Sequence, residues 1–234
     1  MTLPTAIGLD SRARQGLRAT TTAVTVIGLL VAMAAAEHGV GEVVQRPAVS
    51  EGPFIKSWPD TVVFERLNGE PAMTLLPDPV VAGLVTKALS VLFAWVALRN
   101  GARHHAGAAL LVLSGALLLA GGGLAPPLIG SLLGLTWFAA RRVGVRQPGP
   151  GRRRLARLWR VALVVASASY LALFPGTVLL HWWYGVNSAA LVTVLGLAAF
   201  AGLLVLLPAA VAADRLQESR SPDASREPER FVRV

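Results

Sequence analysis

Long apolar runs, separated by short arginine-rich connections, limit this chain to few folds. Apolar residues make up 54% of its 234 residues and charged residues only 15%. A soluble fold of this size needs more polar side chains to cover its surface. Several of the runs approach or exceed the length of about 18 residues with which a helix crosses a bilayer. The sequence therefore predicts an all-α fold, a polytopic bundle of transmembrane helices in an integral membrane protein.

The apolar runs divide into six predicted spans. They cover residues 20–36, 79–98, two segments within 106–140, then 161–181 and 187–213. The first run follows a positive head and ends in small residues, so a cleaved signal peptide is the alternative to a retained helix. Glycines and prolines break the region 106–140, which makes it two short spans or a re-entrant hairpin. The residues of this break are Gly121, Gly122, Gly123, Pro126 and Pro127.

Arginines set the predicted orientation. They flank the region 106–140 on both sides, and the segment 141–160 contains eight of them. The positive-inside rule places both flanks in the cytoplasm, together with both termini of the chain. The predicted location is the plasma membrane of a bacterium. The bilayer is then the expected partner, and anionic lipid is expected to bind along the arginine-rich segment from Arg141 to Arg160. Lipid explains the net charge of +9, so we expect no nucleic acid, and the sequence leaves the oligomeric state open.

One transmembrane domain, residues 19–213, accounts for most of the chain. Residues 1–18 form a cytoplasmic head, and the charged residues 214–234 form a cytoplasmic tail that is expected to be disordered. The loop between the first and second spans, residues 37–78, is predicted to lie outside the cell. It contains seven acidic and three basic residues, so it is the most polar stretch between two spans and the first place to look for a site.

Side chains that can bind a metal gather at the predicted outer face. Glu37, His38 and Glu42 follow the first span, and His38 and Glu42 share a face if the helix continues through them. His181 ends the fifth span on the same side. If these groups are adjacent, two imidazoles and one or two carboxylates suit zinc or a similar divalent cation. Otherwise Glu37, His38 and Glu42 are polar residues at a helix end, His181 belongs to an aromatic belt, and no cofactor is expected.

Lys87 and the glycine–proline break are the candidates inside the membrane. Lys87 lies about 12 Å along the second predicted span, where an ammonium group needs a partner or a wet cavity. It indicates a substrate or proton pathway, or else a lysine that snorkels or pairs with a loop carboxylate. The break can expose backbone groups at membrane depth, although a tight outer turn is the simpler interpretation.

Four motifs follow one another along the chain: EHGVGEVVQ at 37–45, SWPD at 57–60, GEPAMT at 69–74 and GGGLAPPLIG at 121–130. Their order resembles that in a group of uncharacterised bacterial multi-span membrane proteins. The resemblance covers roughly residues 36–131. It implies a multi-span membrane fold and an outer loop that is more than a spacer, and it implies no activity.

Two classes of function follow from these observations. The first is a small permease or ion-coupled carrier that uses Lys87 and the broken segment. The alternative is a non-transporting membrane protein whose outer loop binds a metal, a lipid headgroup or a protein partner. An enzyme is the least favoured class, because the common nucleotide-binding, zinc-protease and nucleophile motifs are absent. The chain has no cysteine, which excludes disulfides and thiolate metal sites.

Overall fold

The protein is mainly helical. The computed structural model describes residues 18–45, 52–58, 62, 65, 69–99, 105–142 and 149–219. Its elements are α2 (Arg18–Gln45), β1 (Phe54–Lys56), β2 (Pro71–Met73), α3 (Pro79–Leu98), α4 (Ala106–Ala120), α5 (Ala125–Arg142), α6 (Pro150–Arg157), α7 (Trp159–Leu171), the π-helical turn η3 (Ala172–Gly176), α8 (Thr177–Tyr184) and α9 (Ala189–Glu218).

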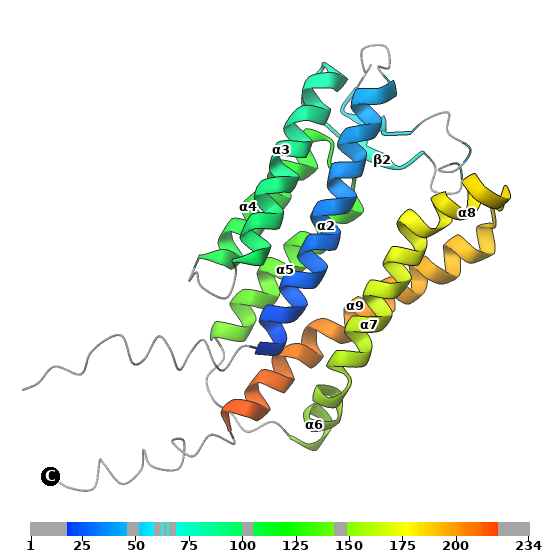
Figure 1. The fold of residues 1–234 in the computed structure, drawn as a ribbon. Helices are drawn as coiled ribbons and strands as arrows, with labels where there is room; N and C mark the ends of the chain where they lie inside the picture. The colour runs from blue at the N-terminus through cyan, green and yellow to red at the C-terminus, as the bar shows by residue number, and fades with distance from the viewer. Residues whose placement is uncertain are drawn as a thin grey trace, which may run out of the picture.

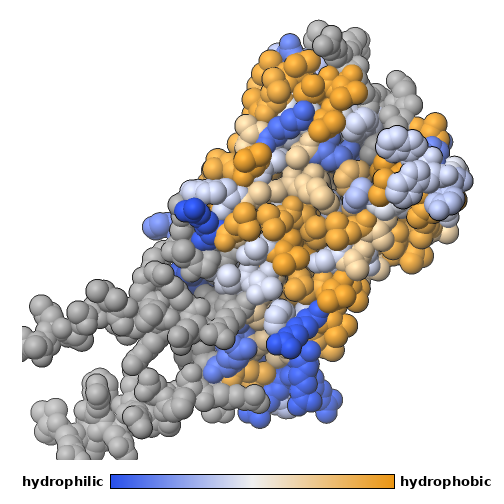
Figure 2. Space-filling model, in the orientation of Figure 1, coloured by the Kyte–Doolittle hydropathy of each residue, from blue (hydrophilic) through white to orange (hydrophobic). Residues whose placement is uncertain are grey.

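Four helical segments are long and apolar enough to cross a membrane. They are Ala19–Val44, Pro79–Leu98, Trp159–Tyr184 and Ala189–Gln217, and α4 is a shorter apolar helix. The helices also expose large apolar side chains, such as Val91, Val112 and Val164, which are each more than 60% exposed. Figure 2 shows this apolar surface over the helices and a hydrophilic surface at the end where α6 lies. Length and surface together support the predicted membrane protein.

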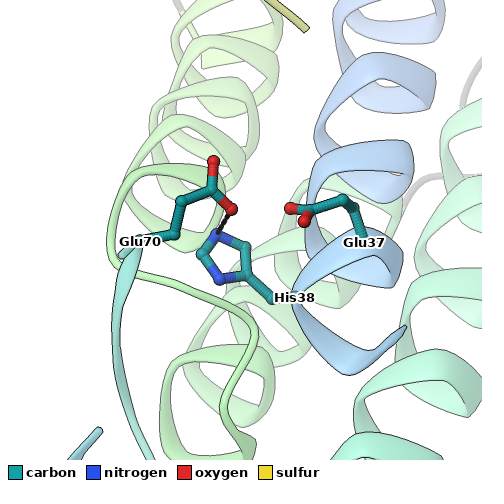
Figure 3. Close-up of side chains that lie close together, drawn as sticks. All are labelled: Glu37, His38 and Glu70. Carbon is teal, nitrogen blue, oxygen red and sulfur yellow. Dashed lines mark ion pairs between the residues drawn. The ribbon is translucent and has the colours of Figure 1, made fainter. Parts of the chain in front are cut away.

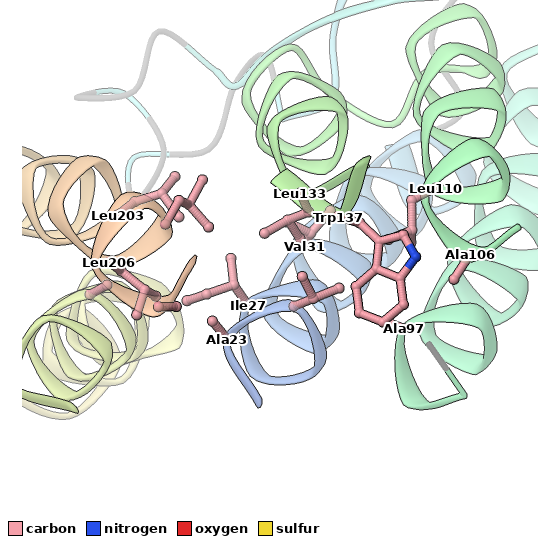
Figure 4. Close-up of a cluster of buried hydrophobic side chains, with 14 of the residues drawn as sticks. Ala23, Ile27, Val31, Ala97, Ala106, Leu110, Leu133, Trp137, Leu203 and Leu206 are labelled. Carbon is pink, nitrogen blue, oxygen red and sulfur yellow. The ribbon is translucent and has the colours of Figure 1, made fainter. Parts of the chain in front are cut away.

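α2 lies at the centre of the bundle (Figure 1), where it contacts α3, α5, α7 and α9. Figure 4 shows its buried residues Ala23, Ile27 and Val31 between side chains of α5 and α9. α2 also continues past the expected end at Ala36 to Gln45, so the loop predicted to start at residue 37 starts later.

The helices form two groups. In the first, α3 packs along α2, and α4 pairs with α5; in the second, α7 and α6 pack on α9. The two groups meet where α2 contacts α9 and α7, and where α5 contacts α9. Figure 1 shows α9 passing beside the lower end of α2 and running away from α2 toward α8.

Asp214 of α9 joins the two groups at the start of α2. Its Oδ1 accepts a hydrogen bond from the backbone N–H of Ala19 at 2.7 Å, and its Oδ2 accepts one from Thr20 at 2.9 Å. The first N–H groups of a helix lack partners within the helix, so a carboxylate there stabilises it. The tail predicted to begin at residue 214 therefore begins later, because α9 continues to Glu218. Residues 1–17 and 220–234 lie outside the described part of the chain.

Three tryptophans mark the end of the bundle that was predicted to be cytoplasmic. Each lies beneath an arginine guanidinium group, and the distances from the guanidinium carbon to the ring centre are 5.3 Å for Arg99–Trp95, 4.7 Å for Arg141–Trp137 and 5.5 Å for Arg160–Trp159. Such aromatic and basic pairs are typical of helix ends at a membrane interface.

The predicted break between α4 and α5 is narrower than the sequence indicates. It spans residues 121–124, and Gly121 and Gly123 adopt positive φ angles of 106° and 78°. Pro126 and Pro127 do not break a helix, since they lie in the first turn of α5, where a missing N–H removes no helical hydrogen bond. The fifth predicted span is interrupted at Pro175, which lies in η3.

Candidate functional site

Two carboxyl groups and an imidazole converge near the C-terminal end of α2. Among the described residues, Glu37, His38 and Glu70 each offer a ligand atom, and these atoms all lie within 4.8 Å of one another. His38 Nε2 is 3.6 Å from Glu70 Oε2. Figure 3 shows Glu37 and Glu70 pointing toward each other from opposite sides of the His38 ring. We call these three residues the carboxylate–imidazole group.

Small residues on α2 let its neighbours close around His38. A Cβ on Gly39 would lie 2.7 Å from the backbone oxygen of Gly83 on α3. A Cβ on Gly41 would lie 2.7 Å from the Trp58 ring. The backbone of α2 is therefore in close contact with α3 on one side and with the loop on another, and the His38 side chain is only 8% exposed.

Ser57 orients the His38 ring. The Nδ1 atom of His38 is 2.9 Å from Ser57 Oγ, and Ser57 is buried at the end of β1. With Nδ1 held in this way, Nε2 faces Glu70. Histidines that bind metals usually use their second ring nitrogen in this manner, because the hydrogen bond fixes the ring and the tautomer.

A short antiparallel hairpin places Glu70 opposite Ser57. β1 and β2 pair from Phe54–Met73 to Lys56–Pro71, and the Ser57 N–H donates to the Glu70 carbonyl at 3.1 Å. Glu70 has a φ of 54°, a left-handed conformation that costs about 1–2 kcal/mol in residues with a Cβ. A strained backbone at a cluster of polar side chains is typical of functional positions.

The glycines of the α4–α5 connection make room for the polar side chains of α2. A Cβ on Gly123 would overlap His38 Nε2, and a Cβ on Gly121 would overlap a carboxylate oxygen of Glu42. The end of α4 is in turn covered by the segment after β2, where the Leu75 N–H donates to the Leu119 carbonyl at 2.8 Å. The four sequence motifs therefore meet at one place in the fold.

Glu37 and Glu70 also line a cavity of about 280 Å³ between the two helix groups. Its walls come from α2, α5, α7, η3 and α9. Tyr170 is the third lining residue with a polar side-chain atom, and the other side chains around the cavity are apolar. The carboxylate–imidazole group thus has an apolar cavity beside it.

The structure brings Glu37 and His38 together and leaves Glu42 and His181 out of the group. His38 and Glu42 share a buried face of α2, as a continuing helix requires. The carboxylate of Glu42, however, lies against Gly121. His181 lines a small space with residues of α8 and of the α8–α9 turn. The expected ligand set of His38, Glu42 and His181 is therefore not the one that converges.

Lys87 lies on α3 and is not a member of the carboxylate–imidazole group. It is half-buried on α3, and its Cγ would lie 3.2 Å from a Cβ on Gly39. Its stem therefore packs against α2. Within the described part of the chain it has no ion-pair partner.

Glu70 is the site residue that sequence reasoning missed. It lies in the motif GEPAMT, between Gly69 and Pro71, and that local pattern indicates a turn. The turn alone does not show which residues Glu70 contacts. Ser57 comes close to it because β1 and β2 pair, and His38 comes close to it because α2 packs beside the hairpin. No family model, curated protein or solved structure matches the chain, so the site is interpreted from its geometry.

We expect Gly123→Ala to destabilise the protein. The substitution places a Cβ at positive φ, which costs about 1–2 kcal/mol, and pushes against the His38 ring. The matched control is Gly115→Ala in the middle of α4, where an added Cβ meets no atom within 4 Å and the gain in helix propensity is up to about 1 kcal/mol. Thermal unfolding in detergent measures both. Equal unfolding temperatures for the two variants would contradict the packing described for Gly123.

Proposed function

We propose that this protein is a metal-binding protein of a bacterial plasma membrane, and that it holds a divalent cation of the zinc class at Glu37, His38 and Glu70. The observation that carries the proposal is the convergence of these three ligand atoms within 4.8 Å. The binding site lies at the outer end of α2, under the hairpin of β1 and β2. This is the non-transporting alternative of the sequence analysis, with the ligand identified as a metal.

The spacing of the donor atoms suits a small ion. Two ligands bonded to one tetrahedral zinc at about 2.1 Å lie about 3.4 Å apart. The separation of His38 Nε2 and Glu70 Oε2 is 3.6 Å, so an ion needs only a small adjustment of these side chains. Three protein ligands would leave a fourth position open, as in zinc sites that bind a further molecule.

Charge and hydrogen bonding also favour a cation. An ion pair between His38 and Glu70 leaves the carboxyl of Glu37 beside another carboxyl. Glu37 Oε1 and Glu70 Oε2 are buried and accept no hydrogen bond from the described residues, which is costly for groups of this polarity. Two carboxylates and a neutral imidazole carry two negative charges, so one divalent ion neutralises them.

The donor set favours a borderline metal over calcium or magnesium. Calcium and magnesium take oxygen ligands almost exclusively, whereas an imidazole with carboxylates suits zinc and its neighbours. The Nδ1 contact to Ser57 supplies the outer-shell hydrogen bond that such a histidine uses.

Binding fits the geometry better than carriage of an ion. The cavity beside the group has apolar walls apart from Glu37, Glu70 and Tyr170, and an ion crossing a membrane needs polar groups along its path. Lys87, on which the carrier hypothesis depended, packs against α2 at Gly39 and is not among the residues that line this cavity. The permease or carrier function therefore stays a prediction, because the lining of this cavity offers no continuous row of polar groups among the described residues.

We further propose six spans, with both termini in the cytoplasm. α4 and α5 have 15 and 18 residues, or about 22 and 27 Å of helix. The break between them lies beside His38 and Glu42, about 30 Å along α2 from its start. That distance is close to the thickness of the hydrocarbon core, which favours two full crossings over a re-entrant hairpin.

If zinc binds at the proposed site, substitution of its ligand residues should weaken zinc binding. Isothermal titration with zinc in detergent should give one site per chain, and His38→Gln and Glu70→Gln should each weaken it at least tenfold, because each removes a ligand. Ser57→Ala should weaken it by about 10–100-fold through the lost support of the ring.

Two matched variants serve as controls for this titration. Glu65→Gln removes an exposed loop carboxylate, and His181→Gln removes the histidine that lies outside the group. Both should bind zinc as the unchanged protein does. Loss of binding in His181→Gln, or unchanged binding in Glu70→Gln, would contradict the proposed ligand set.

The six-span topology predicts the sides of three exposed positions. Because the chain has no cysteine, Gly52→Cys, His105→Cys and Gly149→Cys each introduce a single thiol. A membrane-impermeant maleimide added to whole cells should label the first, and the other two only after the membrane is opened. Labelling of His105→Cys and Gly149→Cys from opposite sides would contradict an even number of crossings between them.

A further inference from the structure

The cavity beside the carboxylate–imidazole group is shaped for an apolar molecule with a polar end. It measures about 280 Å³, and its polar lining residues are Glu37, Glu70 and Tyr170. This volume equals roughly nine water molecules in the liquid. Apolar walls give so many waters too few hydrogen-bond partners, and apolar cavities bind apolar groups instead.

The walls place the cavity where hydrocarbon chains are available. Its lining comes from α2, α7 and α9, which belong to segments long and apolar enough to cross a membrane, and also from α5 and η3. Phe174, Phe200 and Ile129 contribute large apolar side chains to it. At the edge of the cavity are two carboxyl groups that also belong to the proposed metal site.

We propose that the protein binds a linear amphiphile from the bilayer, with its alkyl chain in this cavity and its acidic head on the metal ion. The inference rests on the proposed metal function, because two carboxylates repel an acidic head unless a cation lies between them. Three protein ligands leave one coordination position, and Glu37 and Glu70 put the ion at the cavity wall. The head and the chain are thus recognised by neighbouring parts of one site.

Gly196 makes the chain-binding part testable without touching the metal ligands. It lines the cavity from α9, and a Cβ there would meet no atom within 4 Å. Gly196→Phe therefore adds a ring to the cavity lining at a position where the new Cβ meets no packed neighbour. The matched control is Gly115→Phe, which has the same open surroundings on α4 and does not line the cavity.

The experiment uses the full chain in phosphatidylcholine nanodiscs, loaded with cobalt(II) as a coloured substitute for zinc. Acetohydroxamic acid and dodecanohydroxamic acid carry the same metal-chelating head on a short and a long chain. Each is titrated into the unchanged protein, Gly196→Phe and Gly115→Phe, and the cobalt absorption bands report binding. Partition of the long probe into lipid is the same for all three proteins, so it cancels from the comparison.

We expect both probes to change the cobalt spectrum of the unchanged protein. In Gly196→Phe the affinity for dodecanohydroxamic acid relative to acetohydroxamic acid should fall at least tenfold, while cobalt binding is kept. Gly115→Phe should leave the ratio unchanged. An unchanged ratio in Gly196→Phe, or cobalt bound with no response to either probe, would overturn the inference and leave the metal function standing.

Two further outcomes would also overturn the inference, and they differ in what they say about the metal function. Failure of the protein to bind cobalt or zinc at all would end the metal function, and the inference with it. Dodecylamine is the third probe, because an amine head pairs with carboxylates without a metal. Displacement of cobalt by dodecylamine, with no binding of dodecanohydroxamic acid, would show that the cavity serves a cationic amphiphile and would also overturn the inference.

Discussion

The arrangement of the protein around the C-terminal half of α2 depends on one constraint, the burial of polar side chains on that helix. His38 and Glu42 lie on a face of a long apolar helix and are 6% and 2% exposed. Buried groups of this polarity usually need partners, and His38 has them, whereas both carboxylate oxygens of Glu42 are buried without a hydrogen-bond partner among the described residues. The β1–β2 hairpin brings Ser57 and Glu70 to His38, and the glycines of the α4–α5 connection let the backbone pass close to both side chains. The loop is thus an integral part of the fold.

Some of this structure follows from local sequence, and some does not. α3 begins and ends as predicted, since Asp78 caps its first N–H groups and Pro79 suits its first turn. The end of α2 has no such signal, because Gly39 and Gly41 weaken a helix in isolation and only contacts with α3 and the loop reveal their use. Glu70 and Asp214 escaped prediction for a related reason: each acts on a residue far away in the chain.

The two helix groups give the molecule a division of roles. α2 and the hairpin supply all three members of the carboxylate–imidazole group. α7, η3 and α9 supply no ligand to it and line the apolar cavity from the other side, while Asp214 holds α9 to the start of α2. The groups separate toward α8 (Figure 1), and the apolar cavity is lined by helices of both groups. This placement links the proposed metal to an amphipathic ligand.

X-ray absorption at the zinc edge, on the purified zinc-loaded protein, tests the central claim most directly. The account predicts one imidazole nitrogen and oxygen neighbours at about 2.0–2.2 Å, with the imidazole signal lost in His38→Gln. Two imidazoles in the zinc shell would mean that a second histidine joins the site, and a shell of oxygen atoms alone would mean that His38 is no ligand. Either result would contradict the carboxylate–imidazole group as the metal site.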